Sequence, residues 1–165
     1  MKTLSMTTFL AVVLLLAGVS LAAEDWFDLE NCGMCKNLTE DSELFANMTW
    51  DNQLFANGLV EVNTVPAAYE ERFQKLMARM QAVAARLQAG EQMPLCAMCR
   101  SYGALMMAGA DMDYFTSGDT HISIISSKDP DVVKMIRTHG QRTIDEYAKW
   151  MAAEGAEGQG HDHHH

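Results

Sequence analysis

Two short stretches of the chain alternate apolar and polar residues, which is the pattern of a β-strand with one buried face. The alternation is clearest at Val60-Glu61-Val62 and at Ile122-Ser123-Ile124. A turn signal precedes each stretch, Asn57-Gly58 in the first case and Ser117-Gly118-Asp119 in the second. We therefore expect two β-hairpins, the first closed by a type I′ turn. Their strands are predicted at 48–55 with 59–65, and at 112–116 with 120–126.

Helical periodicity predicts four helices, two short and two long. The short ones, at 32–45 and 95–110, precede the hairpins, and the long ones, at 66–89 and 130–153, follow them. Each long helix begins with a proline, which suits a first turn because the N–H groups there have no intrahelical partner. The apolar stripes of the long helices are Tyr69, Phe73, Leu76, Met77, Met80, Val83 and Leu87, and Val133, Ile136, Ile144, Tyr147 and Met151.

The order helix, hairpin, helix occurs twice, and several landmarks recur at one fixed spacing. The segment Cys32-Gly33-Met34-Cys35 returns 64 residues later as Cys96-Ala97-Met98-Cys99, and Pro66 returns at the same offset as Pro130. We therefore expect one domain, 24–153, built by internal duplication of an αββα unit, with halves 28–90 and 91–153. The expected fold class is α+β, a four-stranded antiparallel sheet with helices packed on one face.

The two ends of the chain differ from this domain. Residues 1–23 combine a basic start, a short apolar run and a small-residue ending, which predicts a secretory signal peptide. We expect export to a periplasmic or extracellular space that permits disulfides, and no membrane-embedded segment after cleavage. Residues 154–165 are predicted to form a flexible tail, because small and polar residues cannot bury a core. The tail contains His161, His163, His164 and His165. This histidine cluster is either the natural end of the protein or a purification tag.

Charge narrows the classes of function. The 165 residues include 22 acidic and 12 basic side chains, which gives a formal charge of −10. A nucleic-acid binder needs clustered Lys and Arg to neutralise phosphates, so that class is excluded. The sequence also has no Ser/His/Asp arrangement, no phosphate-binding glycine loop and no HExxH motif. An ordinary hydrolase or nucleotide enzyme is therefore not expected.

Four cysteines in two C-x-x-C pairs carry the strongest chemical signal. The i, i+3 spacing places both sulfurs of a pair on one side of a helical turn, and a base, Lys36 or Arg100, follows each pair. Covalent haem is excluded, because its motif needs a histidine at that place. Two converging pairs would offer a Cys₄ site for Zn, or thiolates for Cu(I). The cysteines predicted to act as one metal-binding unit are Cys32, Cys35, Cys96 and Cys99.

Other sulfur and nitrogen atoms are secondary candidates. Met34 and Met98 lie inside the pairs and are predicted to be auxiliary thioether ligands, whereas the methionines on the helix stripes are expected to fill the core. Met93 lies near the second pair. The C-terminal histidines are predicted to form a second, weaker metal site. His121 and His139 are expected to be packing or surface residues.

Two alternatives to metal binding stay open. A thiol–disulfide redox protein would use the same four cysteines, and an enzyme of this sequence would be such an oxidoreductase. A non-catalytic exported domain would instead form two structural disulfides, worth about 2–4 kcal/mol each. We favour soft-metal binding, with Cu(I) or Zn held for storage, transfer or sensing. The expected partners are the metal ion and a metal donor or acceptor protein, and the apolar stripes would also suit a homodimer.

Overall fold

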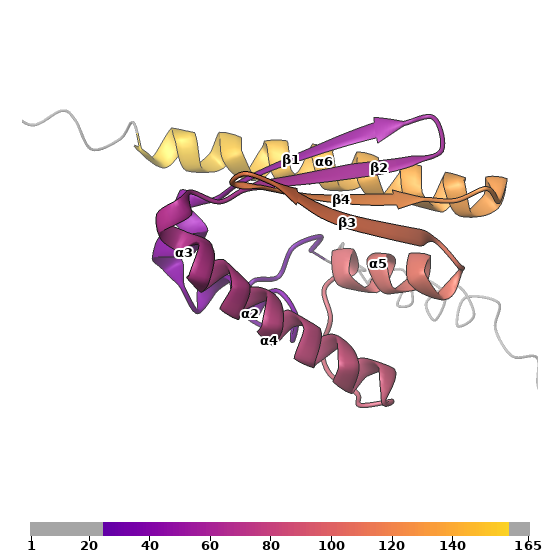
Figure 1. Ribbon diagram of the computed structural model, residues 1–165, viewed down its shortest axis with the longest axis horizontal. Helices are drawn as coiled ribbons and strands as arrows, with labels where there is room; N and C mark the ends of the chain where they lie inside the picture. The colour runs from indigo at the N-terminus through magenta and orange to yellow at the C-terminus, as the bar shows by residue number, and fades with distance from the viewer. Residues whose placement is uncertain (1–24, 159–165) are drawn as a thin grey trace, which may run out of the picture.

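The computed structural model describes residues 25–158, and side chains as far as residue 153. The predicted signal peptide and the histidine cluster lie outside the described residues. Four strands form one antiparallel sheet in the order β1-β2-β4-β3, and helices pack against it (Figure 1). The expected α+β class with a four-stranded antiparallel sheet is therefore confirmed.

Both predicted hairpins are present, and they meet through their second strands. The strands are β1 (Thr49–Phe55), β2 (Gly58–Thr64), β3 (Asp111–Ser117) and β4 (Thr120–Ser126). Strand β2 pairs with β4 in the register Leu59 to Ile125 and Val62 to Ile122. Residues far apart in the chain thus form the centre of the sheet, and the two outer strands come from different hairpins.

The first turn differs from its prediction. Phe55 pairs with Gly58, so the two loop residues are Ala56 and Asn57, and the predicted type I′ turn at Asn57-Gly58 is wrong. Neither Asn57 nor Gly58 has a positive φ, which a type I′ turn requires. Gly58 is needed for a different reason, because a Cβ atom there would lie 2.2 Å from the carbonyl oxygen of Ile125. In the second turn, Gly118 does adopt a positive φ of 63°.

Substitution of Gly58 by Ala is expected to lower the free energy of unfolding by about 2 kcal/mol or more, because β2 and β4 must separate to admit the methyl group. Gly103→Ala is the matched control. Beyond the backbone of its own helix, no atom lies within 4 Å of a Cβ placed at Gly103, so alanine there should raise the free energy of unfolding by up to about 1 kcal/mol. Urea denaturation of the two variants measures both changes. An equal loss in both would contradict the close approach at Gly58.

The single helix predicted at 32–45 is wrong, because this segment forms a turn and two short helices. The chain forms a turn at 33–35, then α2 (Lys36–Thr39), and then α3 (Ser42–Asn47). The break occurs because Asp41 leaves the helical conformation and its side chain accepts the amide of Leu44, which caps α3. The second short helix, α5 (Ala97–Met107), begins one residue after Cys96. Both cysteine pairs therefore lie where a helix starts, and the first pair lies entirely before its helix.

The long helices follow their predictions more closely. A short 3₁₀ turn, η1 (Ala67–Tyr69), leads into α4 (Glu70–Gln88), and Gly90 beyond its end has a φ of 89°. Helix α6 (Pro130–Gly158) extends past the predicted end. Its predicted stripe is partly wrong, because Met151 is exposed and polar His139 and Thr143 are buried instead. Both polar side chains have hydrogen-bond partners, which makes their burial tolerable.

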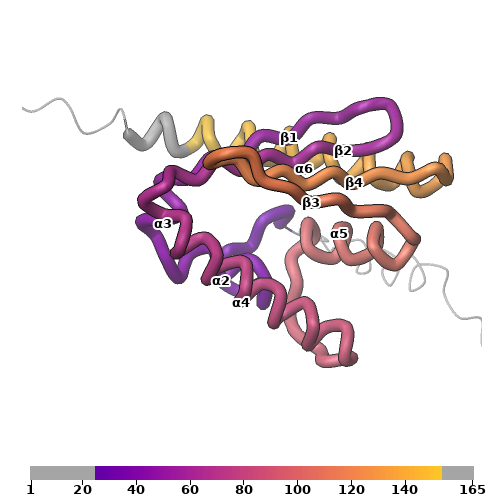
Figure 2. Tube along the Cα trace, in the orientation of Figure 1, coloured from indigo at the N-terminus to yellow at the C-terminus, as the bar shows by residue number. Residues whose placement is uncertain are grey.

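The helices lie on the face of the sheet that carries Leu59 and Ile125. These two residues form one core cluster with Leu105 of α5 and with Val132 and Ile136 of α6. A second cluster joins α3 and α4 to the ends of the strands, and its buried members are Leu44, Met48, Val65, Phe73 and Leu76. Figure 2 shows the N-terminal segment, in indigo, lying between α4 and the beginning of α5.

The internal duplication stays a prediction. The strand order is symmetric about the β2–β4 pair, but α2 and α3 stand in the first half where the single helix α5 stands in the second. Among residues 25–158, no helix combines the length and the apolar character that a membrane span requires.

Candidate metal centre

The first cysteine pair lies in a turn that two polar side chains shape. The carboxylate of Asp28 accepts the backbone amides of Glu30 and Asn31, which folds the chain back just before Cys32. Buried Asn37 then donates its side-chain amide to the carbonyls of Gly33 and Met34, at 3.1 and 2.8 Å. The turn is thus held in place without a surrounding helix.

The second pair begins α5 and is fixed from outside. Cys96 is the N-cap residue, with an extended backbone, and it leaves the first amides of the helix without intrahelical partners. The amides of Ala97 and Met98 donate to the carbonyls of Asp25 and Trp26, at 3.4 and 3.1 Å. The N-terminal segment is therefore tied to the helix that carries Cys96 and Cys99.

One further hydrogen bond joins the two cysteine-bearing segments directly. The amide of Gly33, between Cys32 and Cys35, donates to the carbonyl of Pro94 at 2.8 Å. Within the first pair, the amide of Cys35 also donates to the sulfur of Cys32 at 3.4 Å. Such N–H···S contacts stabilise negative charge on a ligating sulfur. Backbone contacts therefore align the two segments as well as the sulfurs themselves.

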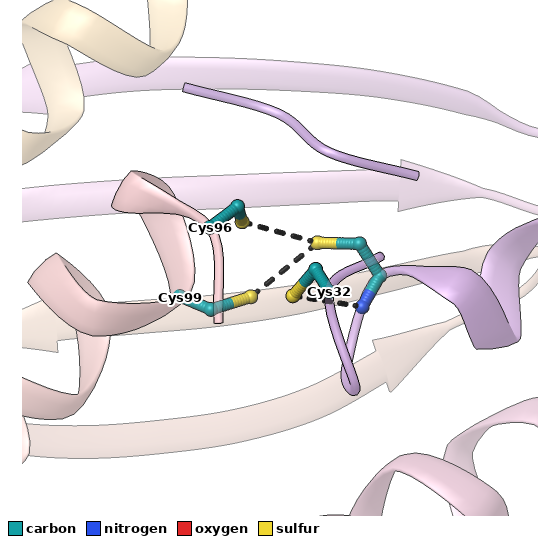
Figure 3. Close-up of side chains that lie close together, drawn as sticks. Cys32, Cys96 and Cys99 are labelled. Carbon is teal, nitrogen blue, oxygen red and sulfur yellow. Dashed lines mark hydrogen bonds between the residues drawn. The ribbon is translucent and has the colours of Figure 1, made fainter. Parts of the chain in front are cut away.

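The four sulfurs form one compact group. All four Sγ atoms lie within 4.8 Å of one another, and those of Cys96 and Cys99 lie 3.5 and 3.4 Å from that of Cys35 (Figure 3). A tetrahedron with metal–sulfur bonds of about 2.3 Å has sulfur–sulfur edges of roughly 3.8 Å, so the group fits a single ion. All four cysteines of the chain are free thiols, and none forms a disulfide. The nearest cysteines of the two pairs, Cys35 and Cys96, are 61 residues apart in the chain.

Burial and mutual hydrogen bonding distinguish the thiols from one another. Hydrogen bonds from Cys99 above all, and from Cys96 and Cys32, lower the pKa of Cys35 to about 6, although burial opposes them. Burial, together with the nearby Cys35 sulfur, raises the pKa of Cys96 to about 11. The pKa of Cys99 is raised, first by the hydrogen bond that its thiol makes with Cys35. A metal ion that binds all four sulfurs must therefore displace protons.

The predicted auxiliary methionines lie beside this group. Met34 and Met98 pack, partly buried, against the cluster formed by Cys32, Cys35 and Cys96. Leu29, Leu95 and Cys99 complete that shell. The side chains packed against the sulfurs are thus apolar, which strengthens the attraction between thiolates and a cation, and the Asp28 carboxylate is near enough to act on the pKa of Cys35. Ligation by Met34 or Met98 stays a prediction.

The histidines of the domain do not join the sulfur group. His121 is buried between Glu70 and Tyr114, with its Nε2 and Nδ1 atoms 3.0 and 2.7 Å from their oxygens. His139 is buried against Trp26, and its Nδ1 lies 3.0 Å from Ser101 Oγ. Burial lowers the pKa of His139 to about 4. Both are packing residues, as the sequence indicated for these two positions.

Trp26 is a site residue that the sequence did not reveal. Its carbonyl accepts the amide of Met98, its indole N–H donates to Thr143 at 3.2 Å, and Arg142 lies 4.4 Å above its ring. The residue therefore joins the second cysteine pair to α6. No local pattern marks it, because every one of these contacts is made with residues more than sixty positions away.

A surface pocket of about 620 Å³ adjoins the sulfur group. Its lining includes Cys32, although only 1 % of that side chain is exposed, and it includes Met93, Asp28 and Glu91. A second pocket, of about 690 Å³, runs along α6 and is lined by none of the cysteines. The 620 Å³ pocket therefore lies against the Cys32 side of the sulfur group.

Comparison with known proteins adds no relative. No protein-family model matches the chain, and neither a curated protein nor a solved structure is similar to it.

Proposed function

We propose that this chain is an exported protein that binds a single soft metal ion, Zn or Cu(I), through Cys32, Cys35, Cys96 and Cys99. The observation that carries the proposal is the group of four free sulfurs within 4.8 Å, drawn from two distant segments. Four thiolates in a tetrahedron suit Zn, and soft thiolate with neighbouring thioether suits Cu(I). The ion would be held for storage, transfer or sensing, with a metal donor or acceptor protein as partner.

The geometry supports a metal over two structural disulfides. Cys35 lies almost equally far from Cys96 and Cys99, at 3.5 and 3.4 Å, so no single pairing is prepared. A disulfide needs a sulfur–sulfur distance of about 2.05 Å, which would pull one pair together and leave the others apart. A central cation instead requires all four sulfurs to lie close together, and no two of them are more than 4.8 Å apart. Export and the homodimer remain predictions from the sequence.

A thiol–disulfide redox protein is the second candidate, and one observation favours it. Hydrogen bonds lower the pKa of the Cys35 thiol to about 6, and its sulfur stands in contact with the Cys99 sulfur at 3.4 Å. A thiolate beside a second thiol is the arrangement that forms a disulfide when an oxidant arrives. This chemistry would link the two segments instead of closing either C-x-x-C pair.

Native mass spectrometry of the purified chain, isolated without reductant, tests the proposal. We expect one ion per chain, lost on denaturation, with four free thiols in the denatured protein. A variant with all four cysteines replaced by serine should lose this tightly held ion. A second variant, with His161, His163, His164 and His165 replaced by alanine, should keep the ion and serves as the control for the tail.

Two results would reject metal binding at the cysteines. One is a metal-free chain lighter by the four hydrogens of two disulfides, which would leave the redox and structural roles. The other is a four-serine variant that retains the ion while the variant without tail histidines loses it.

A further inference from the structure

The pocket beside the sulfur group contains a thioether that the four-cysteine site does not use. Met93 lines the pocket together with Cys32. A Cβ atom built on Gly33 would lie 2.7 Å from the Met93 sulfur, so this sulfur rests against the backbone between Cys32 and Cys35. The hydrogen bond from Gly33 to Pro94 fixes the neighbouring backbone in that position. Met93 thus places a thioether next to the first pair, on the side that faces the pocket.

The charges around the pocket are balanced. Asp28 and Glu91 contribute carboxylates, and Arg100 contributes one positive charge. The guanidinium of Arg86 pairs with Glu91, and that of Arg100 donates to the carbonyl of Leu95. The two carboxylates are thus balanced by Arg86 and Arg100, so it is the soft sulfur of the lining that suits Cu(I), in a chain whose overall charge is negative.

We propose that this pocket is the entrance through which Cu(I) reaches the four cysteines, and that the Met93 thioether is the first protein atom to bind the arriving ion. The inference rests on the proposed function and deepens it. The ion stays Cu(I) throughout. Its bond to a donor ligand breaks as the bond to Met93 Sδ forms, and that bond breaks in turn as the Cys32 sulfur binds and its proton leaves to solvent. Thioether binds Cu(I) well and Zn poorly, so the entrance selects for copper.

The rate of metal uptake tests this inference, since an entrance residue changes the path and not the end state. Cu(I) is supplied as its complex with a chromophoric chelator, and loss of the chelator's absorbance is followed by stopped flow. Met93→Leu is expected to slow Cu(I) uptake by on the order of tenfold and to leave the final affinity and the rate of Zn uptake unchanged. Met107→Leu, at a side chain 91 % exposed and outside the pocket lining, is the control and should match the parent.

A second variant displaces the Met93 sulfur without changing Met93 itself. Gly33→Ala pushes the flexible end of Met93 aside without removing it, so this variant should also slow Cu(I) uptake. Circular dichroism confirms that both variants fold.

Several outcomes would overturn the inference. Unchanged Cu(I) uptake in Met93→Leu would show that the thioether is not on the path. Equal slowing of Zn would show that the side chain acts by shape. A loss of Cu(I) affinity would make Met93 a resident ligand. A parent chain that binds no metal would instead reject the proposed function itself.

Discussion

Loading the reduced chain with Zn²⁺ is expected to raise its unfolding midpoint by on the order of 10 °C or more. An ion that binds the folded chain and not the unfolded one stabilises it by about 4 kcal/mol when its free concentration is a thousand times the Kd. For a domain of this size, each kcal/mol is worth roughly 2–8 °C. The folded chain offers four converging sulfurs, whereas each unfolded segment offers only its own two.

Differential scanning calorimetry in a buffer of fixed free Zn²⁺ measures this shift, with the four-serine variant as control. That variant should show almost no change on addition of Zn²⁺. A similar shift in both proteins would assign the effect to ligands other than the cysteines, such as the tail histidines.

Replacement of Cys35 by Ser is expected to weaken metal binding by about 100-fold or more, which corresponds to about 2.8 kcal/mol. The Cys35 sulfur lies at 3.4 and 3.5 Å from the sulfurs of the other pair, so it occupies the junction of the two segments. A serine hydroxyl does not ionise near neutral pH and is a hard donor, so it cannot replace a thiolate for a soft ion.

Competition with a chelator of known affinity measures the loss at Cys35. Met34→Leu is the matched control, because Met34 packs against the same cluster and leucine preserves its volume. Binding by Cys35→Ser within threefold of the parent would mean that the ion does not use this sulfur.

The hairpins and long helices could be predicted because their signals are local. Alternation, turn residues and proline at helix starts depend only on neighbours in the chain. One error was local, because Asp41 breaks the first helix by capping the next one through the amide of Leu44, three residues away. The other errors arose where distant contacts decide, as at Gly58, which is a strand residue because β4 passes close to it. On α6, the burial of His139 and Thr143 depends on partners from other parts of the chain. His139 is hydrogen-bonded to Ser101, and Thr143 accepts a hydrogen bond from Trp26.

The ligands of the candidate site could be predicted from the sequence, but the contacts that hold them in place could not. The two C-x-x-C pairs identify the four candidate ligands, and the structure brings all four sulfurs together. The contacts that align them, from Trp26 to Met98 and from Gly33 to Pro94, are backbone hydrogen bonds across the fold. Such bonds do not depend on side-chain identity, so the sequence contains no pattern from which to read them. The position of Met93 against Gly33 follows from the same alignment.

The placement of Trp26 gives the chain an optical reporter. Its indole lies against His139 and under Arg142, and its backbone is bonded to the amide between Cys96 and Cys99. The other two tryptophans, Trp50 and Trp150, belong to a separate aromatic group with Phe45 and Tyr147. With those two changed to phenylalanine, the remaining tryptophan emission would come from Trp26 alone, whose backbone contacts the second cysteine pair. Its intensity and wavelength would then follow occupancy of the site in real time, without any added dye.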